Sequence, residues 1–430
     1  MASIRKRPND RWRARYRDAD GQEHSRHFDR KIDARRWLDE VTASIVTGQY
    51  VHPRAGDITF QEYAESWRAI AGHRKSTADL VRRHFANHVY PAIGSKRLKN
   101  ITPSDIRALD AALAETLAPA TIVVIHRYVS AVLAAAVRDR KIATSPSSLV
   151  PAPRVARRKV SPISTELVLR LRDLMPDRYQ AVVITAAGTG MRQGEVFGLT
   201  LDRINFLQRT VAVDRQLVSV AGELPRFAEL KTASSEREIP LPGTVIDALT
   251  QHLDVYPPGP EGLVFTNTDG GPLRRSAFND AWTTARHVAM TAWIWLDVPP
   301  QSRTRTVAHT LGVSGQRAGL LVAQARGAGL IPGVGATLDQ LEAARDALGE
   351  RPRRTVVFHD LRHYYASLLI RHGASVKAVQ ARLGHKSASE TLDTYSHLWP
   401  DDDDRTRGAV DAVLGGAPGV ALPLHPGAVA

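Results

Sequence analysis

Two short runs of sequence decide the fold: FHDLRHYY at residues 358–365 and LGHKSASETLDTYSH at residues 383–397. In the first run His359 and Arg362 are three residues apart in an apolar-periodic segment, so on a helix they share one face, one turn apart. A hydrogen-bond donor and a permanent cation then point at one spot. A guanidinium is a planar fork that matches phosphate oxygens, so this helix is predicted to bind an anion.

The second run adds an imidazole and a phenol. His385 follows the helix-breaking Gly384, and Tyr395 comes ten residues later. A tyrosine whose pKa is near its ordinary value of about 10 is a poor nucleophile at neutral pH. Neighbouring cations would activate it by stabilising the charge of the phenolate and of a phosphorane. Any one of these residues alone is more often structural than functional.

An upstream group of residues strengthens the functional interpretation. Arg192 lies in TGMRQGE at residues 189–195, directly after a glycine-containing turn, and Glu195 one turn later is predicted to orient a neighbour. Lys231 lies in ELKTASSEREIP at residues 229–240, between two short β-like runs. This position predicts the tip of a β-hairpin.

The chain resembles the tyrosine recombinases of the phage-integrase family, whose motifs cover roughly residues 163–400. The residues that carry the resemblance stand in the family's order, each in its expected local context: Arg192, Lys231, His359, Arg362, His385 and Tyr395. The resemblance implies an α+β fold that is mainly α with small β-sheets. It also implies three parts: an N-terminal arm-binding three-stranded sheet with a helix, a helical core-binding domain and a mixed, mainly helical catalytic domain.

Composition agrees with a nucleic-acid partner. A chain of 430 residues exceeds a single core, which predicts two to four domains, and its net charge of +14 attracts a polyanion. A generally basic protein from an arginine-rich proteome is the alternative. The absence of cysteine excludes disulfides, thiolate zinc sites and a catalytic thiol.

The location is predicted from the lack of membrane signals. No uninterrupted apolar run reaches membrane-spanning length, and the N-terminus is basic and polar, without the apolar core of a signal peptide. We therefore expect a cytoplasmic protein without a membrane partner. The resemblance adds a prokaryotic host and association with the nucleoid when DNA is bound.

Residues 1–50 form a small basic module. The run RWRARYR at residues 11–17 alternates arginine with other residues, which predicts a strand with one apolar and one cationic face, and a helix is expected at residues 31–46. An arginine-studded sheet on one helix resembles the arm-type DNA-binding domain of phage integrases; a solvated strand face is the alternative. The candidate DNA contacts here are Arg11, Arg13, Arg15 and Arg17.

Residues 57–150 are predicted to be all helical. Thr102 before Pro103 is an N-cap followed by proline at the first helical position. The region resembles the family's core-binding domain, with an ordinary bundle with charged solvent faces as the alternative. Its candidate DNA contacts are Lys75, Arg82 and Arg83. A basic, proline-broken linker follows at residues 150–159.

The catalytic domain is expected at residues 161–415, with one departure from the family. Roughly fifty extra residues form an insert at about 296–352. Residues 306–329 predict a helix, a glycine turn and a second helix capped by Ser314; this spacing resembles a helix-turn-helix, with Arg317 as the candidate DNA contact. A packing or protein-contact insert is the alternative. A terminal helix carrying Val410 and Val413 is expected to contact a partner subunit, and residues 416–430 to form a flexible tail.

The resemblance implies conservative site-specific recombination by the integrase of a phage or integrative element. Tyr395 would attack a backbone phosphate, leaving a 3′-phosphotyrosyl bond and a free 5′-hydroxyl. Arg192 and Arg362 would hold the non-bridging oxygens, and His359 and His385 would add donors to the five-coordinate transition state.

The remaining implications concern the leaving group, cofactors and partners. Lys231 is the candidate general acid for the departing 5′ oxygen. The phosphotyrosine conserves the bond energy, so no metal, ATP or other cofactor is expected. The implied partners are double-stranded DNA attachment sites and a homotetramer on DNA, with a directionality factor and a host DNA-bending protein as candidate accessory factors. The alternatives are a topoisomerase-like strand-relaxing enzyme and a DNA-binding architectural or regulatory protein.

Overall fold

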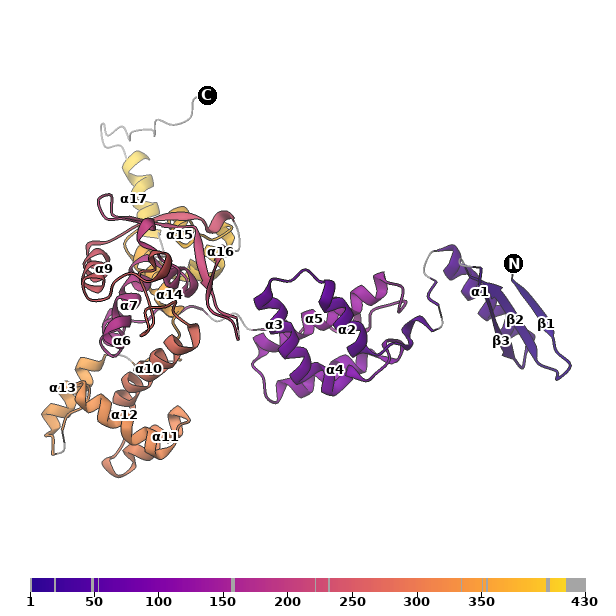
Figure 1. The fold of residues 1–430 in the computed structure, drawn as a ribbon, viewed down its shortest axis with the longest axis horizontal. Helices are drawn as coiled ribbons and strands as arrows, with labels where there is room; N and C mark the ends of the chain where they lie inside the picture. Colours follow the sequence, from indigo (N-terminus) through magenta and orange to yellow (C-terminus); the bar gives the residue numbers. More distant parts are fainter. Residues whose placement is uncertain are drawn as a thin grey trace. The chain divides into compact units, whose positions relative to one another are not determined.

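The computed structural model describes residues 2–18, 21–47, 50–52, 54–155, 159–220, 222–230, 233–333, 335–349, 351–352, 355–399 and 403–414. The chain divides into two compact units, residues 1–157 and residues 158–430 (Figure 1). The described residues are mainly helical with small antiparallel sheets, so the predicted fold class is confirmed. The domain boundaries drawn from the sequence stay predictions.

The first unit begins with a three-stranded sheet covered by a helix. The elements are β1 (Ser3–Lys6), β2 (Trp12–Arg17), β3 (Glu23–Phe28) and α1 (Lys31–Val46). Adjacent strands pair antiparallel in chain order. Side chains of β2 alternate between the two faces of the sheet, and this buries Ala14 and Tyr16. The ring of Tyr16 contacts Trp37 of α1 edge to face, with ring centroids 5.5 Å apart. The predicted sheet and helix are therefore confirmed.

The rest of the first unit is a helical bundle. Its helices are α2 (Phe60–Ile70), α3 (Lys75–His84), α4 (Pro103–Ala114) and α5 (Pro119–Arg138), with a π-helical stretch (Phe85–Gly94) that continues α3. Thr102 caps α4 by accepting from the backbone N–H of Asp105, while the Asp105 carboxylate accepts from the Thr102 backbone. The predicted cap is confirmed. The phenyl rings of Phe60 and Phe85 are fully buried in the bundle core.

Helix α5 has the length and composition of a membrane span, because its 20 residues are mostly apolar. A core helix of a bundle has the same character. Here α5 packs on α2, α3 and α4, and its buried His126 pairs through Nδ1 with the Asp110 carboxylate at 2.9 Å. These contacts indicate that α5 is the bundle's core helix.

The second unit opens with helices and two small sheets. The elements are α6 (Thr165–Asp173), α7 (Asp177–Thr189), α8 (Gln193–Phe197), β4 (Ile204–Asn205), β5 (Thr210–Val213), β6 (Arg215–Val218), β7 (Arg226–Glu229) and β8 (Arg237–Pro240). β8 pairs with β5, whereas β7 pairs with β6. The strands before and after Lys231 therefore belong to different sheets, so the predicted hairpin is wrong, and Lys231 itself lies outside the described residues. A β-like pattern identifies strands without specifying their partners.

Helices dominate the remainder of the second unit. They are α9 (Gly243–Val255), α10 (Arg275–Asp297), α14 (Asp360–Arg371), α15 (Val376–Leu383), α16 (Ala388–Tyr395) and α17 (Asp403–Leu414). Helix α7 packs on α6, α9 and α14 in the main core. A smaller cluster joins α14, α15 and α16 around Tyr365, Leu383 and Tyr395, and Tyr395 is the largest fully buried side chain among the described residues.

The insert contains α11 (Arg303–Leu311), α12 (Gly315–Gly327) and α13 (Leu338–Leu348), at the far end of α10 from α14 (Figure 1). Gly312 ends α11 with a φ of +64°, and Ser314 caps α12, so the predicted helix, glycine turn and helix are confirmed. α12 buries Leu321 and Ala325 in the main core. Whether the insert contacts DNA stays a prediction, as does the partner contact of α17; residues 416–430 lie outside the described part of the chain.

Gly190 is a backbone position that only glycine fits, and we predict that Gly190→Ala destabilises α7 and α14. Its φ is +65°, and a Cβ there would lie 2.4 Å from Cδ1 of Tyr365. The left-handed backbone and the overlap should together lower the opening free energy of α7 and α14 by roughly 2–4 kcal/mol. Hydrogen exchange of the α7 and α14 amides in the full chain measures this loss.

Substitutions at two other glycines, Gly312 and Gly319, separate the cost of the left-handed backbone from the cost of the overlap with Tyr365. Gly312 also has a positive φ but open space around it, so Gly312→Ala should cost only about 1–2 kcal/mol in α11. Gly319 lies inside α12 with open space, so Gly319→Ala should stabilise that helix by roughly 0.5–1 kcal/mol. Equal effects at Gly190 and Gly312 would show that the Tyr365 contact contributes nothing.

Candidate active site

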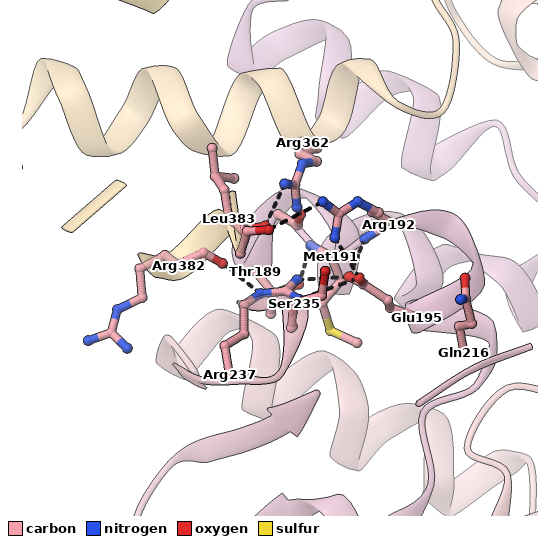
Figure 2. Close-up of polar contacts among 12 residues, drawn as sticks. Thr189, Met191, Arg192, Glu195, Gln216, Ser235, Arg237, Arg362, Arg382 and Leu383 are labelled. Carbon is pink, nitrogen blue, oxygen red and sulfur yellow. Dashed lines mark hydrogen bonds and ion pairs between the residues drawn. The ribbon is translucent and has the colours of Figure 1, made fainter. Parts of the chain in front are cut away.

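The ends of two helices hold a buried guanidinium. Arg362, on the first turn of α14, is 2% exposed and donates through Nη1 to the carbonyl of Gly190 at 2.7 Å and through Nη2 to the carbonyl of Leu383 (Figure 2). These carbonyls belong to the C-terminal ends of α7 and α15, where unpaired carbonyls favour a cation. Burial and Arg192 lower the pKa of Arg362 to about 9, which keeps it protonated at neutral pH.

A buried carboxylate joins two further guanidiniums to this group. Glu195 accepts from Nη1 of Arg192 at 2.9 Å and from Nη2 of Arg237 at 2.8 Å (Figure 2). Burial alone would raise the pKa of Glu195, but Arg237 and Arg192 outweigh it and hold the pKa below its usual value. The predicted orienting role of Glu195 agrees with these ion pairs. Three guanidiniums and one carboxylate leave a positive excess that suits a phosphate.

Arg237 was not identified from the sequence. Its side chain is 5% exposed, and its Nε donates to the carbonyl of Arg382 at 2.9 Å (Figure 2). A signal did exist: Arg237 and Ile239 share one face of β8, and Ile239 is fully buried. An arginine on a buried strand face needs a partner, which the sequence alone does not identify.

The phenol lies beside this cluster, in contact with a histidine that the sequence analysis did not select. Oη of Tyr395 lies 2.7 Å from Nδ1 of His363. The ring of His385 is nearly parallel to the phenol, with centroids 6.4 Å apart, and its Nδ1 lies 2.9 Å from Oγ1 of Thr391. The ring of His359 stands edge-on to His363 at 5.0 Å.

The fold therefore gathers five of the six sequence-predicted site residues around one region. They are Arg192, His359, Arg362, His385 and Tyr395. Lys231 lies outside the described residues. His363 could have been suspected from the sequence because it follows Arg362 directly, but its spacing from Arg362 does not place it on the same helix face.

Burial sets the protonation states here. It raises the pKa of Tyr395 to about 12, and Arg362 offsets only part of that rise. Desolvation therefore outweighs the expected activation of the phenol by cations. Desolvation, and after it nearby charged groups, lower the pKa values of His359 and His385 to about 4; His385 is buried, whereas His359 as a whole residue is exposed. Both imidazoles are neutral at pH 7.

A cavity of about 220 Å³ opens beside the guanidiniums. Its lining residues are Arg192, Glu195, Gln216, Leu230, Ser235, Gly384, Lys386 and Glu390. The side chain of Arg192 is 36% exposed, whereas Arg362 is buried behind it. An anion can therefore reach Arg192 from solvent, and the cavity has room for a phosphate group.

Several candidate DNA contacts of the first unit pair with acidic neighbours. Arg11 pairs with Asp29 at 3.0 Å and Arg82 with Asp79 at 2.7 Å. The other pairs are Arg15 and Arg17 with Glu23, and Arg83 with Asp79. Exposed pairs of this kind are weak, so a phosphate could replace the carboxylate. These DNA contacts stay predictions, as do Arg13 and Lys75.

The side chain of Arg317, in the insert, contacts helix α10 of the same unit. Its Nη2 donates to Oγ1 of Thr284 on α10 at 3.0 Å, and the residue is half-buried. Its predicted DNA contact would require that bond to break, and it stays a prediction.

One group among the described residues has the geometry of metal ligands. Asp18, His24 and His52 place one ligand atom each within 4.8 Å of one another in the first unit. Asp18 already accepts from the backbone of Gln22 at 2.9 Å and lies 2.7 Å from Nε2 of His24. These hydrogen bonds explain why the three side chains lie close together without a metal ion. The expectation that no cofactor is needed stays a prediction.

Family models match three parts of the chain. "Phage integrase, N-terminal domain" matches residues 2–47, and "Phage integrase central domain" matches residues 60–151. "Phage integrase family" matches residues 165–311 and 336–401. The unmatched residues 312–335 lie inside the insert.

Similar proteins include integrases of mycobacteria and their phages. A Mycobacterium tuberculosis protein named as the integrase of prophage phiRv2 is 28% identical over 407 residues, which cover 92% of this chain and 90% of that protein. The integrase of Mycobacterium phage D29 is 27% identical over 275 residues, which cover 60% of this chain and 72% of the phage protein.

Two solved structures share the fold. The Tn1549 transposon integrase in complex with a circular intermediate DNA has a TM-score of 0.56 at 19% identity, over 83% of this chain and 99% of that chain. A lambda integrase dimer bound to a COC′ core site has a TM-score of 0.50 at 16% identity, over 93% and 96% of the two chains.

Glu195 is the only carboxylate bonded to Arg192 and Arg237 among the described residues, and we predict that Glu195→Gln destabilises the second unit by roughly 3–5 kcal/mol. The reason is that two buried or half-buried guanidiniums would lose their counterion. Urea unfolding of the full chain, followed by hydrogen exchange at α8 and β8, measures the loss. Glu238→Gln removes an exposed carboxylate on β8 and should change stability by less than about 0.5 kcal/mol. Equal values for the two variants would contradict this account.

The depressed pKa of His385 predicts a pH dependence of stability. Between its folded value of about 4 and its unfolded value of 6.5, the unfolded chain binds more protons, so stability is lost as pH falls from 6.5 toward 4. The full shift corresponds to roughly 3–3.5 kcal/mol, of which roughly 2–3 kcal/mol is lost between pH 7.5 and pH 4.5. Urea unfolding at pH 7.5 and 4.5 should show this loss in the wild type and a smaller loss in His385→Asn. An unchanged pH dependence in the variant would assign it to other groups.

Proposed function

The chain belongs to the phage integrase family and is a tyrosine recombinase, and from this premise we propose that it integrates mobile DNA by transferring strands through Tyr395. Oη of Tyr395 attacks a backbone phosphate, which forms a 3′-phosphotyrosyl bond and releases a 5′-hydroxyl. The rejoining step reverses this chemistry on a partner strand. The element served is a phage or an integrative element, and the same enzyme is a candidate for excision.

The observation that carries the proposal is the position of the buried phenol beside a cationic cluster. Tyr395 is 1% exposed, its ring is stacked on His385, and Arg362 lies near enough to lower the phenol's pKa in part. No structural need explains this arrangement, because a buried phenol does not require cations around it. A phosphate approaching Arg192 would complete the charge balance.

Each remaining group has a role in this reaction. Arg192 and Arg362 hold the non-bridging oxygens, since their guanidiniums are fixed in advance by Glu195 and by helix-terminal carbonyls. The neutral imidazoles of His359 and His385 donate to the phosphorane. Lys231 protonates the departing 5′ oxygen, a role that rests on its place in the family's order of residues.

The partners follow from the chemistry and from the relatives. The Tn1549 integrase structure contains a circular intermediate DNA, and the lambda integrase dimer is bound to a core site. By analogy, this chain binds double-stranded attachment sites and assembles as a homotetramer on DNA, with the N-terminal sheet on arm sites. A directionality factor and a host DNA-bending protein assist it, in the cytoplasm of a prokaryotic host.

A covalent adduct tests the proposal. Wild-type protein is incubated, without added metal, with a nicked duplex that carries a candidate attachment core, and adducts are separated on a denaturing gel. The wild type should form an adduct, and Tyr395→Phe should form none while it still retards the duplex on a native gel. Arg192→Lys and Arg362→Lys should each slow adduct formation roughly 10²–10³-fold.

The matched control is Tyr256→Phe. Tyr256 lies just after α9, stacked on the Arg178 guanidinium and away from the cluster, so its adduct yield should equal that of the wild type. An adduct that persists in Tyr395→Phe would show that another residue is the nucleophile. Binding without any adduct, on a core shown to recombine in cells, would favour a regulatory DNA-binding protein.

A further inference from the structure

The proton of the attacking phenol needs a destination, and the geometry points to His363. We propose that Nδ1 of His363 accepts the hydroxyl proton of Tyr395 during strand cleavage and returns it during rejoining. This inference rests on the proposed function, because it concerns the same nucleophile.

The contact itself is direct. Nδ1 of His363 lies 2.7 Å from Oη of Tyr395, within the distance over which a general base takes a proton. The two rings meet near edge-on, with centroids 5.6 Å apart and an interplanar angle of 64°. Because His363 follows Arg362 on α14, one helical turn fixes both the proton acceptor and a phosphate-binding guanidinium.

A proton acceptor is required because the phenol enters the reaction protonated. Burial raises the pKa of Tyr395 to about 12, so only about one molecule in 10⁵ carries a phenolate at pH 7. Arg362 lowers this pKa only in part. Attack on phosphorus therefore proceeds with transfer of the proton to a neighbouring base.

The other imidazoles are placed less well for this transfer. The ring of His385 lies parallel to the phenol at 6.4 Å, and its Nδ1 is engaged by Thr391. His359 contacts the ring of His363, and within the described residues no hydrogen bond joins it to Tyr395. His363 thus stands between His359 and the phenol.

Every bond and proton of the cleavage step is accounted for. The bond between Oη and phosphorus forms, and the bond between phosphorus and the 5′ oxygen breaks. The hydroxyl proton passes to Nδ1 of His363, and the leaving 5′ oxygen takes a proton from Lys231. The imidazolium forms while the phosphorane gains negative charge beside it. In rejoining, the 5′-hydroxyl attacks phosphorus and gives its proton back to Lys231, while Nδ1–H of His363 protonates the departing Tyr395 oxygen.

The surrounding groups set the conditions for this role. The titratable and charged groups on α14 and on the elements packed against it include Asp360, Arg362, Arg371, Asp177, Arg178, Lys377, Arg382 and His397, and His359, Arg192 and His385 lie beside them. The role requires the tautomer of His363 that carries its proton on Nε2, since Nδ1 must accept. Nitrogen-15 spectra of the wild-type protein report this tautomer without any substitution. A proton on Nδ1 would overturn the proposal.

Kinetics supply the second test. Single-turnover adduct formation is measured from pH 5 to 9 on the nicked attachment-core duplex. His363→Asn keeps a polar atom close to the Nδ1 position but is not basic, so it should react roughly 10²–10⁴-fold slower than the wild type with unchanged duplex affinity. Its rate should rise tenfold per pH unit up to pH 9, because hydroxide then removes the proton. The wild-type profile should be less steep over the same pH range, because an internal base takes the proton in place of hydroxide.

Two further variants test the same role: His363→Ala for rescue by added imidazole, and His372→Asn as a control. Added imidazole should restore part of the rate to His363→Ala, because it can occupy the space of the lost ring. His372 is an exposed histidine at the end of the same helix, so His372→Asn should match the wild type. A rate for His363→Asn within about threefold of the wild type would assign His363 a positioning role and overturn proton acceptance.

The two proposals fail in different ways. If the wild type forms no adduct on a proven core, the strand-transfer function itself is wrong. If the wild type forms an adduct through Tyr395 and His363→Asn does so equally fast, only the role of His363 is wrong.

Discussion

The second unit depends on one buried carboxylate. Glu195 holds Arg192 and Arg237 through charge-assisted hydrogen bonds of 2.8–2.9 Å, with the Glu195 side chain only 1% exposed. Removing these charges from water is costly, and the attraction between them offsets that cost only because the geometry is close and specific. The carboxylate neutralises one positive charge and leaves the others for a ligand. Structure and reactivity therefore rest on the same ion pairs.

Helix ends complete the support of the cationic cluster. Gly190 and Gly384 end α7 and α15 in the left-handed conformation, which turns the chain sharply at each helix end. The carbonyls of Gly190 and Leu383 then face Arg362. Fixed dipoles of this kind hold a guanidinium in place before substrate arrives, which is the condition for electrostatic catalysis.

Burial and reactivity oppose each other at Tyr395. Its complete burial stabilises the small core of α14, α15 and α16, but the same desolvation raises the phenol's pKa. A phenol kept protonated at rest depends on a bound phosphate and on a neighbouring proton acceptor for its reaction, and the proposed acceptor, His363, is already in contact with it. The burial of Tyr395 against α14, α15 and α16 thus both stabilises the fold and keeps the phenol protonated.

The sequence by itself determined the elements that depend on neighbours along the chain. The α1 helix at Lys31–Val46, the Thr102 cap and the Gly312 turn all follow local rules of periodicity and capping. It also identified five residues that the fold gathers at the site. Only the tertiary structure decided which strands pair across β5, β7 and β8, that Arg237 binds Glu195, and that His363 meets Tyr395. Contacts between distant segments depend on how whole helices and sheets pack, and local sequence patterns do not encode that arrangement.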